Sequence, residues 1–107
     1  MVNELNKHYY KIYFIDFTYA EKEMADIISR NKKVTALDHH LTREKSVKMT
    51  QDYRYSINNS GAAIAWKYFH PDKLMPKLIQ YIEDQDIGKF SLPNTRAISA
   101  FIDSIDY

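Results

Sequence analysis

Asp38, His39 and His40 are the residues in this sequence whose types and spacing most clearly suggest chemistry. Because the chain has no cysteine, any bound metal must be held by carboxylates and imidazoles, which favours harder ions such as Mn²⁺ or Mg²⁺. In such a site one imidazole ligates the metal and the other is left for a substrate. The alternative is a polar loop with two chance histidines, so the position of the tripeptide in the fold must decide between the two interpretations.

Three further acids lie near the ends of apolar segments. Asp16 is close to the end of the aromatic and β-branched run 9–17, and taken alone it is best interpreted as an acid that caps the following helix or faces solvent. Asp84 and Asp86 follow an apolar segment that is typical of a helix. Acids are disfavoured at a helix C-terminus by the helix dipole, which favours a functional role for this pair. Which of the two acids is the ligand stays open.

The elements that must position these groups follow the order strand, helix, strand. The run 9–17 is predicted to be a buried strand. Residues 18–21 (TYAE) have a capping-box pattern and apolar residues then recur at helical spacing, which predicts a helix from about residue 19 to 31. Residues 33–37 are predicted to form a second strand, directly before Asp38. This order predicts an α/β fold with a parallel sheet and flanking helices.

The rest of the chain is predicted to consist of short elements. They are a loop or short helix at 42–51, a strand at 53–57, a helix at 61–69 capped by Asn59 or Ser60, a helix at 74–83 with Pro76 in its first turn, and a helical segment at 94–105. A hydrophobic content of 45% in 107 residues suits one domain with one core, covering 1–107. If the first two strands are neighbours, Asp16 and Asp38 meet at the carboxyl edge of the sheet, where ligands bind in parallel α/β folds.

Charge and hydropathy exclude several classes of protein. The net charge is +1 and the basic residues are spread along the chain, which gives no support to strong non-specific binding of nucleic acid. No apolar run approaches the ~20 residues that span a bilayer. The segment 1–7 lacks the apolar stretch of a signal peptide. We therefore expect a cytoplasmic protein without a membrane partner.

Four segments, taken together in this order and spacing, resemble successive motifs of the DHH family of phosphoesterases. They are Ile15–Tyr19, Leu37–His40, Asn59–Ala62 and Tyr81–Asp86, and the resemblance extends from about Tyr13 to Phe101. It implies a parallel α/β domain, usually followed by a smaller substrate-binding domain. It also implies hydrolysis of phosphodiesters, phosphomonoesters or phosphoanhydrides with two divalent metals, commonly Mn²⁺.

The resemblance also implies roles for individual residues. Asp16 would bridge the two metals, His39 would ligate one of them, and Asp86 (or Asp84) would complete the shell of that metal. His40 would contact the substrate phosphate. The substrate class implied is a phosphorylated small molecule, a nucleotide or a short oligonucleotide.

By the same resemblance, Asp38 would not bind the metal itself but would orient the imidazoles of the two histidines. The resemblance is nevertheless partial, because the first Asp-rich motif of the family has no counterpart before Asp16 and the C-terminal substrate-binding domain has none after the last helix. We therefore expect a partial DHH-type domain that holds ligands for about one metal and is not fully active alone. The alternatives are a non-catalytic remnant that binds a metal or a nucleotide, and a structural domain with incidental histidines. A truncated sheet edge also predicts self-association.

Overall fold

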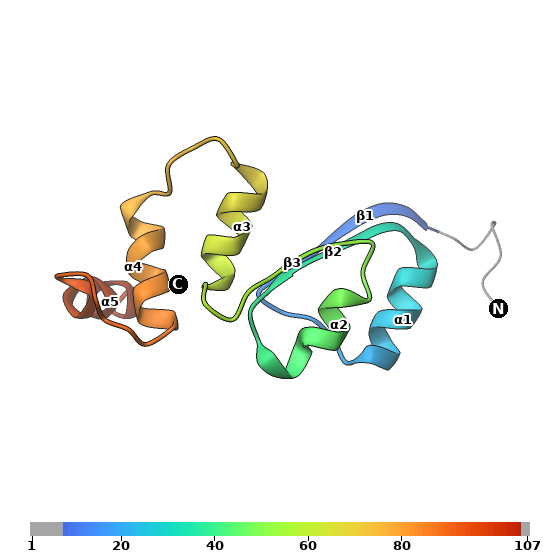
Figure 1. Cartoon of the computed structure of the whole chain (residues 1–107), viewed down its shortest axis with the longest axis horizontal. Helices are drawn as coiled ribbons and strands as arrows, with labels where there is room; N and C mark the ends of the chain where they lie inside the picture. The colour runs from blue at the N-terminus through green and yellow to red at the C-terminus, as the bar shows by residue number, and fades with distance from the viewer. Residues whose placement is uncertain (1–7, 106–107) are drawn as a thin grey trace.

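The computed structural model describes residues 8–105, with side chains described from residue 10 onward. Three parallel strands form one sheet in the order β1-β2-β3, with helices packed against it (Figure 1). The elements are β1 (His8–Ile15), α1 (Glu21–Arg30), β2 (Asn31–Asp38), a 3₁₀ turn η2 (Leu41–Arg43), α2 (Glu44–Lys48), β3 (Asp52–Tyr55), α3 (Gly61–Phe69), α4 (Lys77–Asp86) and α5 (Thr95–Asp103). This arrangement confirms the predicted α/β fold class.

Helices cover both faces of the sheet. α1 and α2 lie together on one face in Figure 1, where Met24 of α1 and Val47 of α2 are fully buried. α3 covers the other face, where its Tyr68 ring packs edge-on against Tyr13 of β1 with centroids 6.3 Å apart. The central strand β2 has a fully buried run at 34–38, as expected for a parallel strand covered on both faces.

The register of the first two strands aligns their carboxyl ends. Ile15 pairs with Leu37, and the next backbone N–H, that of Asp16, donates to the Leu37 carbonyl at 2.8 Å. Asp16 and Asp38 directly follow the paired residues Ile15 and Leu37, so the two aspartates lie side by side on neighbouring strands. The condition for the two acids to meet, that the first two strands are neighbours, is therefore met.

The start of α1 differs from the prediction. The N-cap is Ala20, without a side-chain hydrogen bond, and the Thr18 hydroxyl is buried with no hydrogen-bond partner among the described residues. The predicted capping box at 18–21 is therefore wrong. The rings of Phe17 and Tyr19 pack edge-on at 4.9 Å, which fixes this segment as an extended connection before the helix begins.

The three later helices form where they are predicted, and two of them, α4 and α5, differ in their bounds. α3 has the predicted bounds, and Ser60 caps it by accepting from the Ala63 N–H at 3.1 Å. α4 begins three residues later than predicted, because Pro76 occupies the N-cap position. It also continues to Asp86, so the acids at 84 and 86 lie within the helix.

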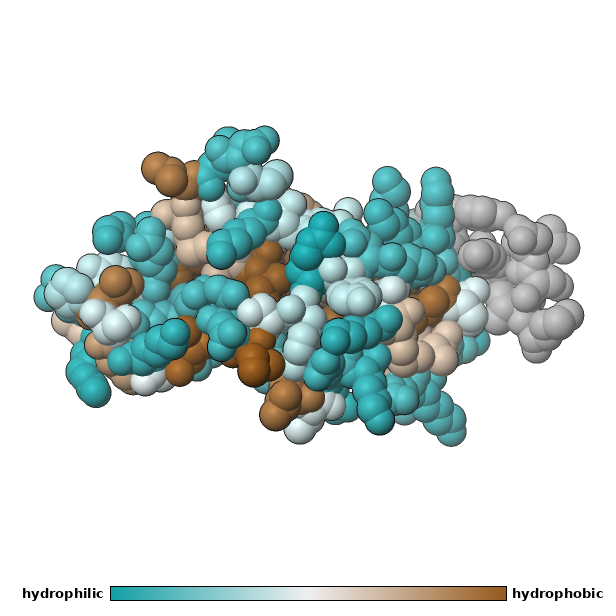
Figure 2. Space-filling view, in the orientation of Figure 1, coloured by the Kyte–Doolittle hydropathy of each residue, from teal (hydrophilic) through white to brown (hydrophobic). Residues whose placement is uncertain are grey.

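The surface in Figure 2 mixes polar side chains with separate apolar patches. Among the described helices, none has both the length and the apolar content required to cross a membrane. Exposed large apolar side chains are found on β1 and in the loop before α4, where Leu74 is 95% exposed.

Candidate metal centre

A cluster of carboxylates and imidazoles lies at the carboxyl edge of the sheet, where β1 and β2 end. Asp16, Asp38, His39 and His40 each offer one ligand atom there, and these atoms all lie within 4.8 Å of one another. This edge is where parallel α/β sheets bind their ligands. These are four of the six residues singled out in the sequence, and a fifth, Asp86, reaches His39 from α4.

Asp16 occupies an unusual backbone conformation. Its φ of 63° is in the left-handed region, which non-glycine residues adopt rarely and at a cost of about 1–3 kcal/mol. Gly61, the first residue of α3, lies directly beside it: a Cβ built on Gly61 would meet the Cβ, Cγ and Oδ1 atoms of Asp16 at 2.5 Å. The turn at Asp16 and the glycine at Gly61 together direct this carboxylate into the cluster.

Asp38 is completely buried and organises the tripeptide. Its Oδ1 accepts from the backbone N–H of His39 at 2.7 Å, from that of His40 at 3.3 Å, and from Nδ1 of His40 at 2.7 Å. An ionised carboxylate only accepts hydrogen bonds, so Nδ1 of His40 carries a proton in this contact. The other oxygen, Oδ2, is buried without a hydrogen-bond partner among the described residues.

His39 points between two carboxylates. Its side chain is 12% exposed, and Nε2 lies 3.0 Å from Oδ1 of Asp16 and 3.4 Å from Oδ2 of Asp86. Despite these short distances Nε2 has no aligned hydrogen bond with any described residue. A buried polar atom without a hydrogen bond needs a physical explanation. A cation bound jointly by His39, Asp16 and Asp86 would provide it. Their convergence from β1, β2 and α4 has the form of a cation site.

His40 is the more exposed of the two imidazoles. Its side chain is 51% exposed, its ring centroid is 4.4 Å from that of His39, and its Nδ1 lies 3.9 Å from Oδ1 of Asp16. Because Nδ1 is engaged by Asp38, Nε2 is the ring nitrogen left to contact a ligand.

Asp84 and Asp86 have separate surroundings, although both lie near the end of α4. Oδ1 of Asp84 accepts from the N–H and hydroxyl of Ser91, and Oδ2 accepts from the Leu92 N–H and the Thr95 hydroxyl. Burial alone raises the pKa of Asp84, but these hydrogen bonds outweigh it and hold the pKa at about 2. Asp84 therefore anchors the start of α5, and the structure brings Asp86 to His39 instead.

Glu83 is a residue of this region that the sequence did not reveal. Its Oε1 accepts from the Asn59 amide at 3.0 Å, and its Oε2 is 3.3 Å from the Ser60 hydroxyl and 3.4 Å from the Ser60 N–H. These contacts hold α4 against the start of α3, and hence hold Asp86 near His39. The sequence signal was weak, because the partners are separated by more than twenty residues.

Comparison with known proteins yields one curated relative. No protein-family model matches the chain, and no solved structure matches it. The relative is an uncharacterized protein of Acanthamoeba polyphaga mimivirus, 35% identical over 82 residues that make up 75% of this chain and 20% of the viral protein. The chain thus spans about a fifth of the length of that relative.

Proposed function

We propose that this chain carries part of the active site of a metal-dependent phosphohydrolase of the DHH type, which hydrolyses a phosphate ester or phosphodiester bond. The observation that carries the proposal is the convergence of two carboxylates, from Asp16 and Asp86, on the buried Nε2 of His39. The resemblance of four sequence segments to successive motifs of that family supports the same activity.

The donor set suits Mn²⁺ or Mg²⁺. It consists of carboxylate oxygens and one imidazole nitrogen, without the thiolates that would favour softer ions. Asp16, His39 and Asp86 would hold the ion, and the 49% exposure of the Asp16 side chain leaves room for a substrate oxygen or a second ion. A bound divalent ion would stabilise charge on the phosphoryl oxygens and lower the pKa of an attacking water.

The other two residues act on the substrate side. The buried carboxylate of Asp38 fixes the His40 ring through Nδ1 and both backbone amides of the tripeptide. His40 donates to Asp38 through Nδ1, which leaves Nε2 as the ring nitrogen that faces the substrate phosphate. Asp38 is thus a positioning residue, and His40 is the one that touches the substrate.

The second candidate function is a non-catalytic metal- or nucleotide-binding domain. The observation in its favour is that the described residues gather possible ligands at one position only, whereas the proposed chemistry uses two metals. A chain with this geometry would bind an ion and perform no turnover unless further ligands come from elsewhere.

Hydrolysis of bis(p-nitrophenyl) phosphate and p-nitrophenyl phosphate, with Mn²⁺ or with a chelator, separates the two candidates. The proposal predicts Mn²⁺-dependent release of nitrophenol that falls by at least about 100-fold in Asp16→Asn. Asp72→Asn, in the exposed loop after α3, is the matched control and keeps full activity. Bound Mn²⁺ without turnover of either substrate would favour the non-catalytic domain.

A further inference from the structure

A hollow of about 420 Å³ lies between β3 and α3, outside the metal cluster. Two of its lining residues are cations and none is a carboxylate, and its other walls are apolar or carry hydroxyl and amide groups. The residues that matter here are Arg54, Ser56, Asn59, Ile64, Lys67 and Pro71. A concave site with convergent cations and an apolar wall suits an organic anion.

Arg54 is held in place by neighbours on the same side of the sheet. Its Nη1 donates to Oδ1 of Asp52 at 2.8 Å and to the Tyr53 carbonyl at 2.8 Å, and its guanidinium lies over the Tyr68 ring, 5.1 Å from the centroid. Asp52 is itself held from the other side by the Tyr68 hydroxyl. The remaining N–H groups of Arg54 make no hydrogen bond with a described residue, so they are available to an anion.

Lys67 is the second cation of the hollow. It is exposed on α3 and makes no ion pair with any residue in the range 8–105. Asp52 offsets part of the charge of Arg54, so Lys67 gives the hollow its net positive charge. Arginine adds a fork that matches a phosphate, and lysine adds a point charge.

The hollow begins where the metal cluster ends. The Ser56 N–H donates to the Asp38 carbonyl at 3.3 Å, and Gly61, two residues after Asn59, touches Asp16. Lys67 lies six residues further along α3 than Gly61, which is about 9 Å along the helix axis. A ligand that reaches from Asp16 to Lys67 would therefore span about two turns of α3.

We propose that the hollow between β3 and α3 is a second anion subsite, which takes an additional phosphate or similar group of a substrate whose scissile phosphate lies beside Asp16. The inference rests on the proposed function and adds a substrate class to it: phosphate esters with a second anionic group about 9 Å from the first. Arg54 and Lys67 bind that group, and Ile64 and Pro71 contact the body of the molecule.

Hexamethylene bisphosphonate tests the subsite without turnover, because its carbon–phosphorus bonds are not hydrolysed. Hexylphosphonate is the matched probe that lacks the second group. With Mn²⁺ present, calorimetry should give an affinity for the bisphosphonate about tenfold or more above that for hexylphosphonate. Lys67→Ala and Arg54→Ala should remove this advantage, and Lys22→Ala on α1 should retain it. Equal affinities, or an advantage that survives both substitutions, would overturn the subsite.

A metal-free measurement keeps this test separate from the proposed function. Hexylphosphonate added to the chain without Mn²⁺ should shift the backbone amide NMR signals of Ser56 and Lys67, and Lys67→Ala should abolish the shift. If Mn²⁺ does not bind but these shifts occur, the proposed function fails and the anion site stands. If Mn²⁺ binds and hexylphosphonate causes no shift, the anion site fails and the metal centre stands.

Discussion

Gly61 at the start of α3 lies so close to Asp16 that a Cβ on the glycine would be 2.5 Å from the Cβ and Oδ1 of the aspartate. Real Cβ atoms essentially never approach other atoms this closely, and the partner here is the rigid base of a short side chain. A glycine at the first position of α3 is therefore required by the neighbouring carboxylate, in a helix that otherwise has no need of one.

Gly61→Ala should displace Asp16 and weaken metal binding. We expect the affinity for Mn²⁺ to fall by about 10–100-fold, as for other changes to groups that orient a ligand. Ala25→Gly, on the exposed surface of α1, is the control: it should cost about 1 kcal/mol of helix stability and leave the affinity unchanged. Calorimetric titration of both variants makes the comparison, and unchanged affinity in Gly61→Ala would contradict the role given to this contact.

Asp38→Asn should release the ring of His40 while keeping the size of the buried side chain. In the native chain Nδ1 of His40 donates to Oδ1 of Asp38, so the proton is held on that nitrogen. An amide can either accept or donate, so the variant should show mixed tautomers in long-range ¹H–¹⁵N spectra of the imidazole. We also expect about 10–100-fold weaker Mn²⁺ binding. A His40 ring with the same tautomer in both proteins would argue against the positioning role of Asp38.

Asp84 should make the stability of the α4–α5 region depend on pH. Its folded pKa of about 2 lies below the value of ~3.9 for an unfolded chain, so its contribution is present above about pH 4 and is lost as the pH falls through 2. Asp84→Asn should lower the melting temperature at neutral pH by several degrees, and the gap to wild type should close near pH 2. Asp103→Asn, exposed at the end of α5, should show no such gap. A gap that is constant from pH 7 to pH 2 would exclude this assignment.

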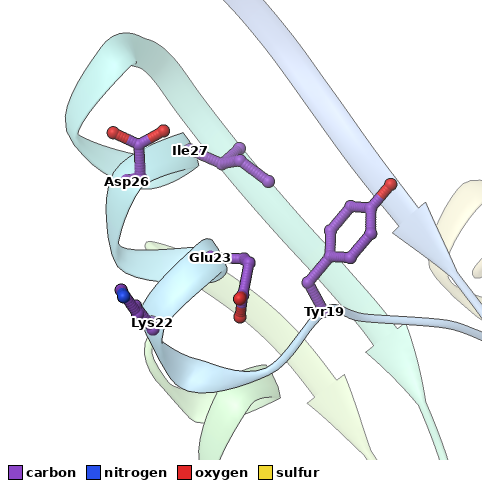
Figure 3. Close-up of a pocket in the computed structure, with 5 residues that line it drawn as sticks. All are labelled: Tyr19, Lys22, Glu23, Asp26 and Ile27. Atoms are coloured by element: carbon purple, nitrogen blue, oxygen red, sulfur yellow. The ribbon is translucent and has the colours of Figure 1, made fainter.

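The sheet edge at β1 is unusually apolar for an exposed strand. Tyr13 and Ile15 on one side of β1, and Phe17 and Tyr19 just after it, are each about half exposed. A hollow of about 580 Å³ also opens beside α1, and Figure 3 shows Tyr19 and Ile27 on its side toward β1, with Glu23 on the side of α1 that faces Tyr19. Parallel strands are normally covered on both faces, so this edge favours association with another chain.

Tyr19→Lys should weaken that association. Sedimentation velocity at increasing concentration should show the wild type forming dimers or larger species, and the variant should remain monomeric at the same concentrations. Leu74→Lys removes a more exposed apolar side chain from the loop before α4 and should leave association unchanged. A wild type that stays monomeric throughout would contradict the prediction.

Local pattern was sufficient to predict the α/β class with a parallel sheet, the first strand–helix–strand unit and the four residues at the carboxyl edge. The predicted capping box is wrong because the Phe17 ring packs on the Tyr19 ring and holds the chain extended past Thr18. Residue propensities carry no information about such a side-chain contact. The choice between Asp84 and Asp86 was also beyond the sequence. That choice depends on hydrogen bonds that the loop before α5 donates to Asp84, and on the hydrogen bond between Glu83 and Ser60. Both join residues that are distant in the sequence.

The central claim is that His39, Asp16 and Asp86 form a divalent-metal site. Calorimetric titration of Mn²⁺ into the wild-type chain, His39→Ala and His70→Ala tests it most directly. His70 packs on Trp66 with ring centroids 4.2 Å apart, so its replacement is a matched loss of one imidazole elsewhere. We predict saturable binding to the wild type and to His70→Ala, and at least about 100-fold weaker binding to His39→Ala. Failure of the wild type to bind Mn²⁺ or Mg²⁺, or equal binding by His39→Ala, would contradict the claim.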